Sequence, residues 1–138
     1  MADSAPTFTG VHLFARDMAA TVAFYRAIGL TVAEHDELSR VTSDGAEMVF
    51  GSYELTLRYD PAFQPSTGSA VALQVALGSR EAVDDMHARL TAAGYATNLA
   101  PFDAFWGSRY AEVRDPDGVI VGFQSPRDPA RNTDPPNP

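Results

Sequence analysis

The side chains best suited to chemistry lie in the last third of the sequence, where aromatic and polar residues alternate. Phe102, Phe105 and Trp106 come shortly before Tyr110 and Glu112. Flat aromatic faces beside a few hydrogen-bonding groups are typical of pockets for planar small molecules. This stretch therefore predicts a site for an aromatic ligand. A core role for Trp106, wedged beneath the strands, fits the pattern equally well.

Few residues could support metal or nucleophile chemistry. The chain has no cysteine, which excludes thiolate catalysis, disulfides and Cys-ligated zinc. Its histidines are His12, His35 and His87. We expect His35, at a strand end, and His87, on the polar face of a helix, to be solvated. His12 lies among aromatic residues, where a histidine more often lines a pocket than binds a metal. We find no catalytic triad order, phosphate-binding Gly loop or basic patch.

Composition narrows the class of protein further. The chain has 138 residues, a formal charge of −8 and a pI near 4.6. This charge argues against nucleic-acid binding, which depends on Lys and Arg at phosphates, and favours a neutral or cationic small molecule. No apolar run approaches a membrane span, and the start lacks a signal-peptide pattern. We therefore expect a cytoplasmic protein with no membrane partner.

The elements that must position these residues follow from periodicity. In the first half we expect a strand over Thr7 to Ala15 and then a helix that begins at Asp17 and ends at Gly29. Further strands are expected over Leu30 to His35, around Ala46 to Phe50, and over Tyr53 to Tyr59. A connector rich in turn-forming residues then runs from Asp60 to Gly68.

The second half repeats this order. A strand is expected over Ala70 to Leu77, then a helix that is capped by Ser79 and stops at Gly94, and a strand near Tyr95 to Leu99. A hairpin over Phe105 to Pro126 closes the half, with its turn at Asp115-Pro116-Asp117-Gly118. We interpret this as a duplicated βαβββ unit: one domain, residues 1–126, with modules at about 7–60 and 69–126. The proline-rich tail, residues 127–138, is expected to be disordered.

Two motifs carry a family resemblance. The Asp115 to Gly118 turn with its following strand, and Arg16-Asp17-Met18 followed by Phe24-Tyr25-Arg26 and Gly29-Leu30, resemble the vicinal-oxygen-chelate superfamily of glyoxalases, bleomycin resistance proteins and dioxygenases. The resemblance covers about Thr7 to Pro126. It implies an α+β fold in which paired βαβββ modules form a curved eight-stranded mixed sheet around a cavity. Trp106 to Tyr110 is most similar to the bleomycin-resistance-like branch, whose members act as homodimers.

The resemblance also locates four metal-ligand positions. Aligned on Asp17, Val75 and Asp115, these positions are Gly10, Thr56, Ala70 and Gly122. None offers a metal-binding side chain, whereas divalent metal catalysis needs three or four convergent ligands. The comparison therefore implies no metal and no other cofactor. A displaced metal site built from His12, Glu54 and Glu112 is the alternative.

Strand alternation separates a helix-covered face from a face that would line the cavity. The second set is aromatic and polar, and no catalytic residue or metal ligand is assigned within it. The predicted ligand-binding residues are His12, Phe14, Glu54, Arg58, Gln74, Phe102, Phe105, Trp106, Tyr110, Glu112 and Gln124.

Two classes of function follow. The favoured hypothesis is a cofactor-free protein that sequesters an aromatic or cationic, antibiotic-like molecule in a groove shared by a homodimer. The alternative is an enzyme of the same superfamily. It would be a lyase or dioxygenase with a displaced metal site, or an isomerase or hydrolase using Glu54 or Glu112 as general base.

Overall fold

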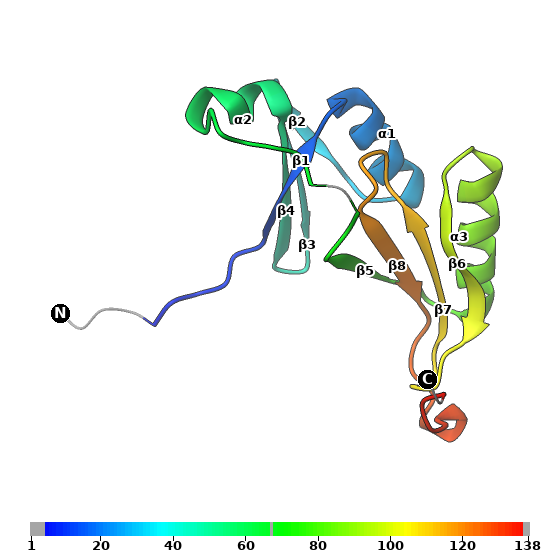
Figure 1. The fold of residues 1–138 in the computed structure, drawn as a ribbon. Coiled ribbons are helices and arrows are strands. Elements are labelled where there is room, and N and C mark those ends of the chain that lie inside the picture. The colour runs from blue at the N-terminus through cyan, green and yellow to red at the C-terminus, as the bar shows by residue number, and fades with distance from the viewer. Residues whose placement is uncertain (1–4, 67, 137–138) are drawn as a thin grey trace. The chain divides into compact units, whose positions relative to one another are not determined.

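The computed structural model describes residues 5–66 and 68–136. Contacts between residues divide the chain into two compact units, residues 1–65 and residues 66–138. The boundary lies inside the predicted connector. Figure 1 shows the elements of both units.

Unit 1 contains four strands and two helices within its described residues. The elements are β1 (Val11–Ala15), α1 (Met18–Ile28), β2 (Ala33–His35), β3 (Leu38–Ser43), β4 (Ala46–Ser52) and α2 (Tyr53–Tyr59). The strand order is β1-β4-β3-β2, with β1 parallel to β4 and the other pairs antiparallel. Helix α1 covers one face of this sheet, where the rings of Tyr25 and Phe50 lie 4.7 Å apart.

Unit 2 repeats the same topology. Its elements are β5 (Ala72–Ala76), α3 (Arg80–Ala92), β6 (Thr97–Asp103), β7 (Arg109–Arg114), β8 (Ile120–Gln124) and a short 3-10 helix (Pro129–Arg131). The order is β5-β8-β7-β6, again with only the first pair parallel. The predicted α+β class with paired βαβββ modules is confirmed. In the described residues the eight strands form two four-stranded mixed sheets.

Local sequence signals set the ends of both long helices. The Asp17 side chain accepts a hydrogen bond from the Ala20 amide, and the Ser79 hydroxyl accepts one from Ala82. Gly29 ends α1 in the left-handed conformation, with φ at 105°, and its amide donates to the Arg26 carbonyl. These are the N-cap and C-cap arrangements expected from the sequence.

Asp115 organises the closing hairpin. Its Oδ1 accepts hydrogen bonds from the amides of Asp117 and Val119, at 2.8 and 2.9 Å, and its carbonyl accepts one from Gly118. The turn therefore fixes the register of β7 and β8, in which Tyr110 faces Gln124. This register decides which side chains share a face.

Each sheet has a covered face and an open face. In unit 2, Val113, Val121 and Phe123 are fully buried on the face that packs against α3. Register places the alternate residues on the other side, which we call the open face of unit 2; they include Gln74, Tyr110, Glu112, Gly122 and Gln124. The open face of unit 1 likewise carries His12, Phe14, Leu38, Val49 and Gly51.

The predicted strand over Tyr53 to Tyr59 is wrong, because these residues form helix α2. The Ser52 hydroxyl caps the helix by accepting from the Leu55 amide at 3.0 Å. Glu54 lies in the first turn and Arg58 in the last, which suits the helix dipole. The alternating pattern was therefore outweighed by a cap and by good helix formers.

The prediction also missed β3 and overextended three strands. Shorter in the structure than expected are the strands over Thr7 to Ala15, Leu30 to His35 and Ala70 to Leu77, which form β1, β2 and β5. A signal for β3 is present in Asp44-Gly45, where both residues have positive φ, 50° and 83°. Two such residues are typical of the type I′ turn that joins hairpin strands.

The described part of the tail contains a short helical segment. Residues 129–131 form a 3-10 helix capped by Asp128, whose Oδ1 accepts from the Ala130 amide at 3.0 Å. The Asp128 amide donates to the Gly107 carbonyl, and the Thr133 amide donates to the Phe105 carbonyl. This part of the tail is bonded to the loop before β7. Across the described residues, no helix is both long enough and apolar enough to span a membrane.

Candidate functional site

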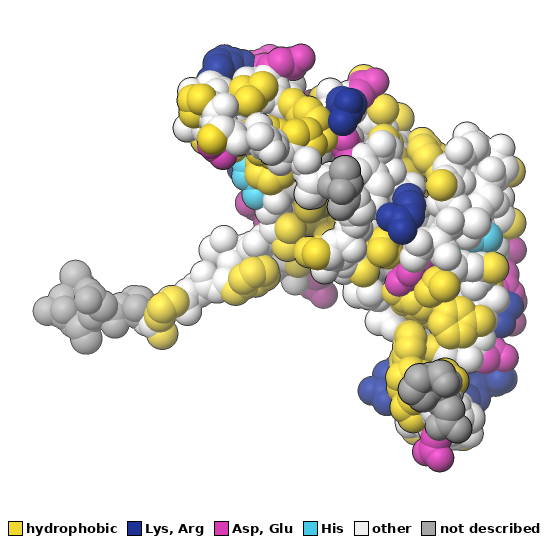
Figure 2. All heavy atoms as spheres, in the orientation of Figure 1, with side chains coloured by type: hydrophobic (Ala, Val, Ile, Leu, Met, Phe, Trp, Pro, Cys, Tyr) yellow, Lys and Arg dark blue, Asp and Glu magenta, His cyan; other side chains and the backbone are white. Residues whose placement is uncertain are grey.

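Four aromatic rings gather on unit 2 where β6 ends and β7 begins. The Trp106 ring lies 5.0 Å from Phe105, 5.3 Å from Tyr110 and 6.5 Å from Phe102, all in edge-type geometry. Phe102 and Phe105 are 37% and 38% exposed, whereas Tyr110 is buried. The exposed parts of Phe102 and Phe105 offer aromatic surface to a flat molecule. Figure 2 shows hydrophobic side chains exposed at this end of unit 2.

A chain of hydrogen bonds runs beside these rings on the open face. The Gln74 amide donates to the Tyr110 hydroxyl at 3.1 Å, and this hydroxyl donates to Glu112 Oε2 at 2.6 Å. The other oxygen of Glu112 accepts from Asn98 at 2.7 Å. Arg114 donates in turn to Asn98 Oδ1 at 2.8 Å. Three strands, β5, β6 and β7, thereby supply one connected polar set, and the carboxylate of Glu112 has no direct ion pair within it.

The electrostatics keep Tyr110 protonated. Burial, followed by the hydrogen bond to Glu112, raises the pKa of Tyr110 to about 12. The phenol therefore acts as a hydrogen-bond donor to the carboxylate over the whole physiological range. Trp106 is likewise held by a polar contact, since its Nε1 donates to Gln124 Oε1 at 3.3 Å. Trp106 is half-buried, so it is neither a fully enclosed core anchor nor a free surface ring.

Tyr110 also fills the space above Gly122. A Cβ built on Gly122 would lie 2.3 Å from the Tyr110 hydroxyl and 2.9 Å from its Cζ. No side chain can therefore extend from position 122 unless Tyr110 moves.

Unit 1 brings together a second, smaller aromatic group. His12 and Phe14 lie side by side on the open face with ring centroids 4.8 Å apart, and Phe14 contacts Phe63 at 4.8 Å. Phe63 also meets Tyr53 edge-on at 5.3 Å. The His12 ring covers Gly51, because a Cβ there would lie 2.8 Å from His12 Nε2.

Glu54 and Arg58 do not join this group as the sequence predicted. Both lie on α2 and not on a strand, and both are exposed. The Arg58 guanidinium forms an ion pair with Glu37, which lies in the turn between β2 and β3. Neither residue therefore has the position on a strand face from which its binding role was inferred.

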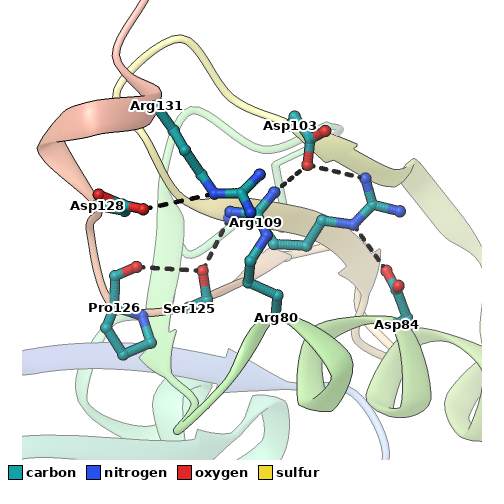
Figure 3. A network of polar contacts seen from close by, with 8 residues as sticks. All are labelled: Arg80, Asp84, Asp103, Arg109, Ser125, Pro126, Asp128 and Arg131. Carbon is teal, nitrogen blue, oxygen red and sulfur yellow. Dashed lines mark hydrogen bonds and ion pairs between the residues drawn. The ribbon is translucent and has the colours of Figure 1, made fainter.

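A cluster of charged side chains supports the base of the aromatic site. Arg109, at the start of β7, pairs with Asp84 of α3 at 2.9 Å and with Asp103 of β6 at 3.2 Å, and Arg80 also contacts Asp103 (Figure 3). The hydrogen bond to Asp84 is the main cause that raises the pKa of Arg109 above its ordinary value. These contacts connect helix and strands at the loop that carries Phe105 and Trp106.

Residues 7–123 match the Glyoxalase/Bleomycin resistance protein/Dioxygenase superfamily. The chain belongs to this superfamily. No curated protein matches the sequence. Among solved structures, a superfamily member from Nocardioides is 24% identical with a TM-score of 0.71, covering 92% of this chain and 87% of its own.

Two solved structures whose names state a function are also similar to this chain. The lactoylglutathione lyase of Agrobacterium tumefaciens is 19% identical with a TM-score of 0.65, covering 89% of this chain and 96% of its own. The fosfomycin resistance protein of Listeria monocytogenes is 14% identical with a TM-score of 0.70, covering 93% and 99%. At these identities the likeness shows the fold alone.

The residues present do not fit the metal that the superfamily implies. A Cβ on Gly10 would lie 2.2 Å from the Glu47 carbonyl oxygen, so the backbone closes this position to a side chain, whereas Gly122 is covered by the Tyr110 side chain. Thr56 lies in α2, where its hydroxyl donates to the Ser52 carbonyl, and Ala70 has no donor atom in its side chain. No group of three His, Cys, Asp or Glu side chains in residues 5–66 and 68–136 could hold a metal.

Sequence reasoning missed several residues of these two groups. Asn98 and Arg114 belong to the polar set of unit 2, and Phe63 and Tyr53 to the aromatic group of unit 1. Arg114 could have been found, because it lies two residues after Glu112 on the same face of β7. Phe63 lies in the connector, where no periodic pattern reports on the position of a side chain.

Proposed function

We propose that this chain is a metal-free binding protein that holds a flat aromatic cation on the open face of unit 2. The observation that carries this proposal is the pairing of exposed aromatic rings with the carboxylate of Glu112. Glu112 is bonded to Tyr110 and Asn98 but has no direct cationic partner among the contacts of this set. Aromatic faces and a nearby carboxylate both attract a cation, and the net charge of −8 adds to this attraction.

The chemistry of the four superfamily ligand positions supports the metal-free part of the proposal. Tyr110 occupies the space from which a ligand at position 122 would extend, and the Glu47 backbone closes position 10. A protein that only sequesters its ligand needs ring faces and hydrogen bonds and no Lewis acid. We extend the proposal to an antibiotic-like ligand and the bleomycin-resistance-like branch on the basis of the aromatic stretch from Phe105 to Tyr110. The cytoplasmic location expected from the sequence is kept as part of this proposal.

The enzymatic alternative has less support from the site. Both oxygens of Glu112 already accept a hydrogen bond, so half of the acceptor capacity of this carboxylate is used within the site. Glu54 is exposed on α2 of unit 1 and is not a member of the hydrogen-bonded polar set of unit 2.

We further propose a homodimer. Sheet edges are left at β1 and β2 in unit 1 and at β5 and β6 in unit 2, and edges of this kind are commonly covered by a partner. Leu57 and Tyr59 on α2 are 45% and 61% exposed, and Figure 2 shows hydrophobic side chains gathered over this helix. A second copy would cover such a surface.

A titration tests the proposed function directly. Proflavine, a flat aromatic cation, is added to the protein while Trp106 fluorescence is recorded, and thermal-shift assays with zinc, manganese and nickel run in parallel. We expect proflavine to quench Trp106 and stabilise the fold by about 2.7 kcal/mol at a hundred times its Kd, with no effect from the metals. Metal-dependent stabilisation without proflavine binding would contradict the proposal.

A further inference from the structure

The loop that carries Trp106 is hydrogen-bonded to a segment that belongs to no strand of the sheet. We call residues 104–108 the aromatic loop. Within it, the Gly107 amide donates to the Ala104 carbonyl and the Ala104 amide donates to the Ser108 carbonyl, at 3.0 and 2.9 Å. These bonds close a tight turn. The carbonyls of Phe105, Trp106 and Gly107 are all used by another segment.

That segment is residues 127–133, which we call the strap. The Arg127 side chain donates to the Trp106 carbonyl at 3.0 Å. The Asp128 amide donates to the Gly107 carbonyl at 3.1 Å, and the Thr133 amide donates to the Phe105 carbonyl at 2.9 Å. Three consecutive residues of the aromatic loop are therefore bonded to three residues of the strap, and Figure 1 shows the strap in red beside the end of β6.

Gly107 permits this close approach. Its φ is +93°, and a Cβ there would lie 2.4 Å from the Asp128 carbonyl oxygen and 2.6 Å from Asn132 Oδ1. Any other residue would separate loop and strap or strain the turn. The strap has its own order as well, because Asp128 caps its 3-10 helix and pairs with Arg131 at 3.5 Å (Figure 3).

The strap contributes no residue to the hydrophobic core of unit 2. All of residues 126–136 are exposed, so the segment buries little apolar surface and contributes polar contacts almost alone. Its contacts with the loop are made at the backbone on both sides of Trp106. A segment with this pattern acts on the position of the loop and contributes little to the stability of the unit.

We infer that the strap is a positioning element of the aromatic site, which fixes the Trp106 ring in the orientation that receives ligand. The ligand-binding part of this inference rests on the proposed function, whereas the fixing of Trp106 does not. Arg127 and Thr133 are positioning residues in this scheme, because each acts through the loop backbone.

The test uses full-length protein with Arg127→Ala and Thr133→Pro combined, which removes one side-chain donor and one amide donor. Asn132 has φ and ψ of −62° and 137°, a conformation that a following proline accepts. Arg40→Ala is the control, since it removes a half-exposed arginine of unit 1 whose ion pair is with Glu47 and not with the strap. Arg127→Lys, which keeps a donor and the charge, tests for rescue of the single Arg127→Ala variant.

Acrylamide quenching and anisotropy of Trp106, the chain's only tryptophan, report the position of the loop without any ligand. We expect the double variant to melt as the parent does, to show about a twofold or greater rise in the quenching constant, and to lose anisotropy, while the control is unchanged. Unchanged quenching and anisotropy in the double variant would overturn the inference. A double variant that shows no cooperative melting transition would overturn it as well, because the strap would then stabilise the fold of the unit.

Proflavine titration of the same proteins separates the two proposals. If both are right, the double variant binds about tenfold more weakly than the parent, because a mobile loop must be ordered on binding. If the parent does not bind proflavine but the quenching result holds, the proposed function fails and the strap stands. If the parent binds and the double variant binds equally well with a mobile loop, the strap has no role in ligand binding.

Discussion

The Tyr110 hydroxyl lies directly over Gly122, and a Cβ at this position would come within 2.3 Å of it. The contact is possible only because residue 122 lacks a side chain. It places a buried phenol, bonded to Gln74 and Glu112, at a position where the superfamily resemblance would put a metal ligand.

Gly122→Ala should displace Tyr110 and lower the free energy of unfolding by about 1–3 kcal/mol, the usual cost of forcing a methyl group into a packed site. Urea denaturation measures the effect. Gly78→Ala is the control, because a Cβ at Gly78 meets no atom within 4 Å. Equal free energies of unfolding for both variants would show that Tyr110 can move aside without destabilising the fold.

Tyr110 should also give the protein a distinct alkaline transition. Its pKa is raised from 10.0 to about 12 in the folded state. The folded state therefore holds the proton more tightly than the unfolded state, so this contribution is complete below pH 10 and is lost as pH rises through 12. We expect stability to fall over this window in the parent and to fall less in Tyr110→Phe. Parallel pH curves for the two proteins would contradict the assignment.

Trp106→Ala should weaken binding of proflavine by about 1–3 kcal/mol, the range for loss of a stacking face, and should leave a cooperative fold. A loss of about 3–5 kcal/mol of stability would instead indicate a core anchor. Isothermal titration and thermal melting of the same variant distinguish these results. Trp106→Phe, which keeps a ring, is the control and should retain most of the affinity.

The protein purified without chelator should contain far less than one equivalent of zinc, iron, manganese or nickel. The reason is the absence of donor side chains at Gly10, Ala70 and Gly122. Elemental analysis by plasma mass spectrometry provides the measurement. About one metal per chain, lost on His12→Ala, would restore the displaced site.

Light scattering should report a dimer at micromolar concentration. Leu57→Glu together with Tyr59→Glu should shift it toward monomer, because two charges would be placed on an exposed apolar surface of α2. Glu81→Gln, on the exposed face of α3, is the control. A monomeric parent across this range would remove the dimer from the proposal.

Residues whose local signals agree with one another were predictable. Asp17, Ser79 and Asp115 behave as caps and turn residues should, and the alternation around Tyr110 and Glu112 assigns them correctly to one face. The site beyond that face was harder to foresee. Asn98 donates a hydrogen bond to Glu112 across a β-bulge between β6 and β7. At a bulge the regular alternation of side chains between the two faces of the sheet is interrupted, so the sequence pattern does not assign Asn98 to a face.

Tyr53 to Tyr59 shows the other limit of prediction. Its residues alternate as a strand would, yet the cap at Ser52 and the helix-forming Glu54, Leu55 and Arg58 favour α2. A period-two pattern of seven residues is too short to exclude a helix. The error moved Glu54 and Arg58 into the predicted site.

The two units differ in how a side chain covers a glycine on the open face. Gly51 and Gly122 both lie on the strand that runs parallel to the first strand of their unit, and both lack room for a side chain. Yet Gly51 is covered by His12 from its parallel neighbour, and Gly122 by Tyr110 from its antiparallel neighbour. The two glycines are also not equivalent positions, because Gly51 pairs with Phe14, three residues before the cap Asp17, and Gly122 pairs with Gln74, five residues before the cap Ser79. The open faces of the two units are therefore filled by different contacts.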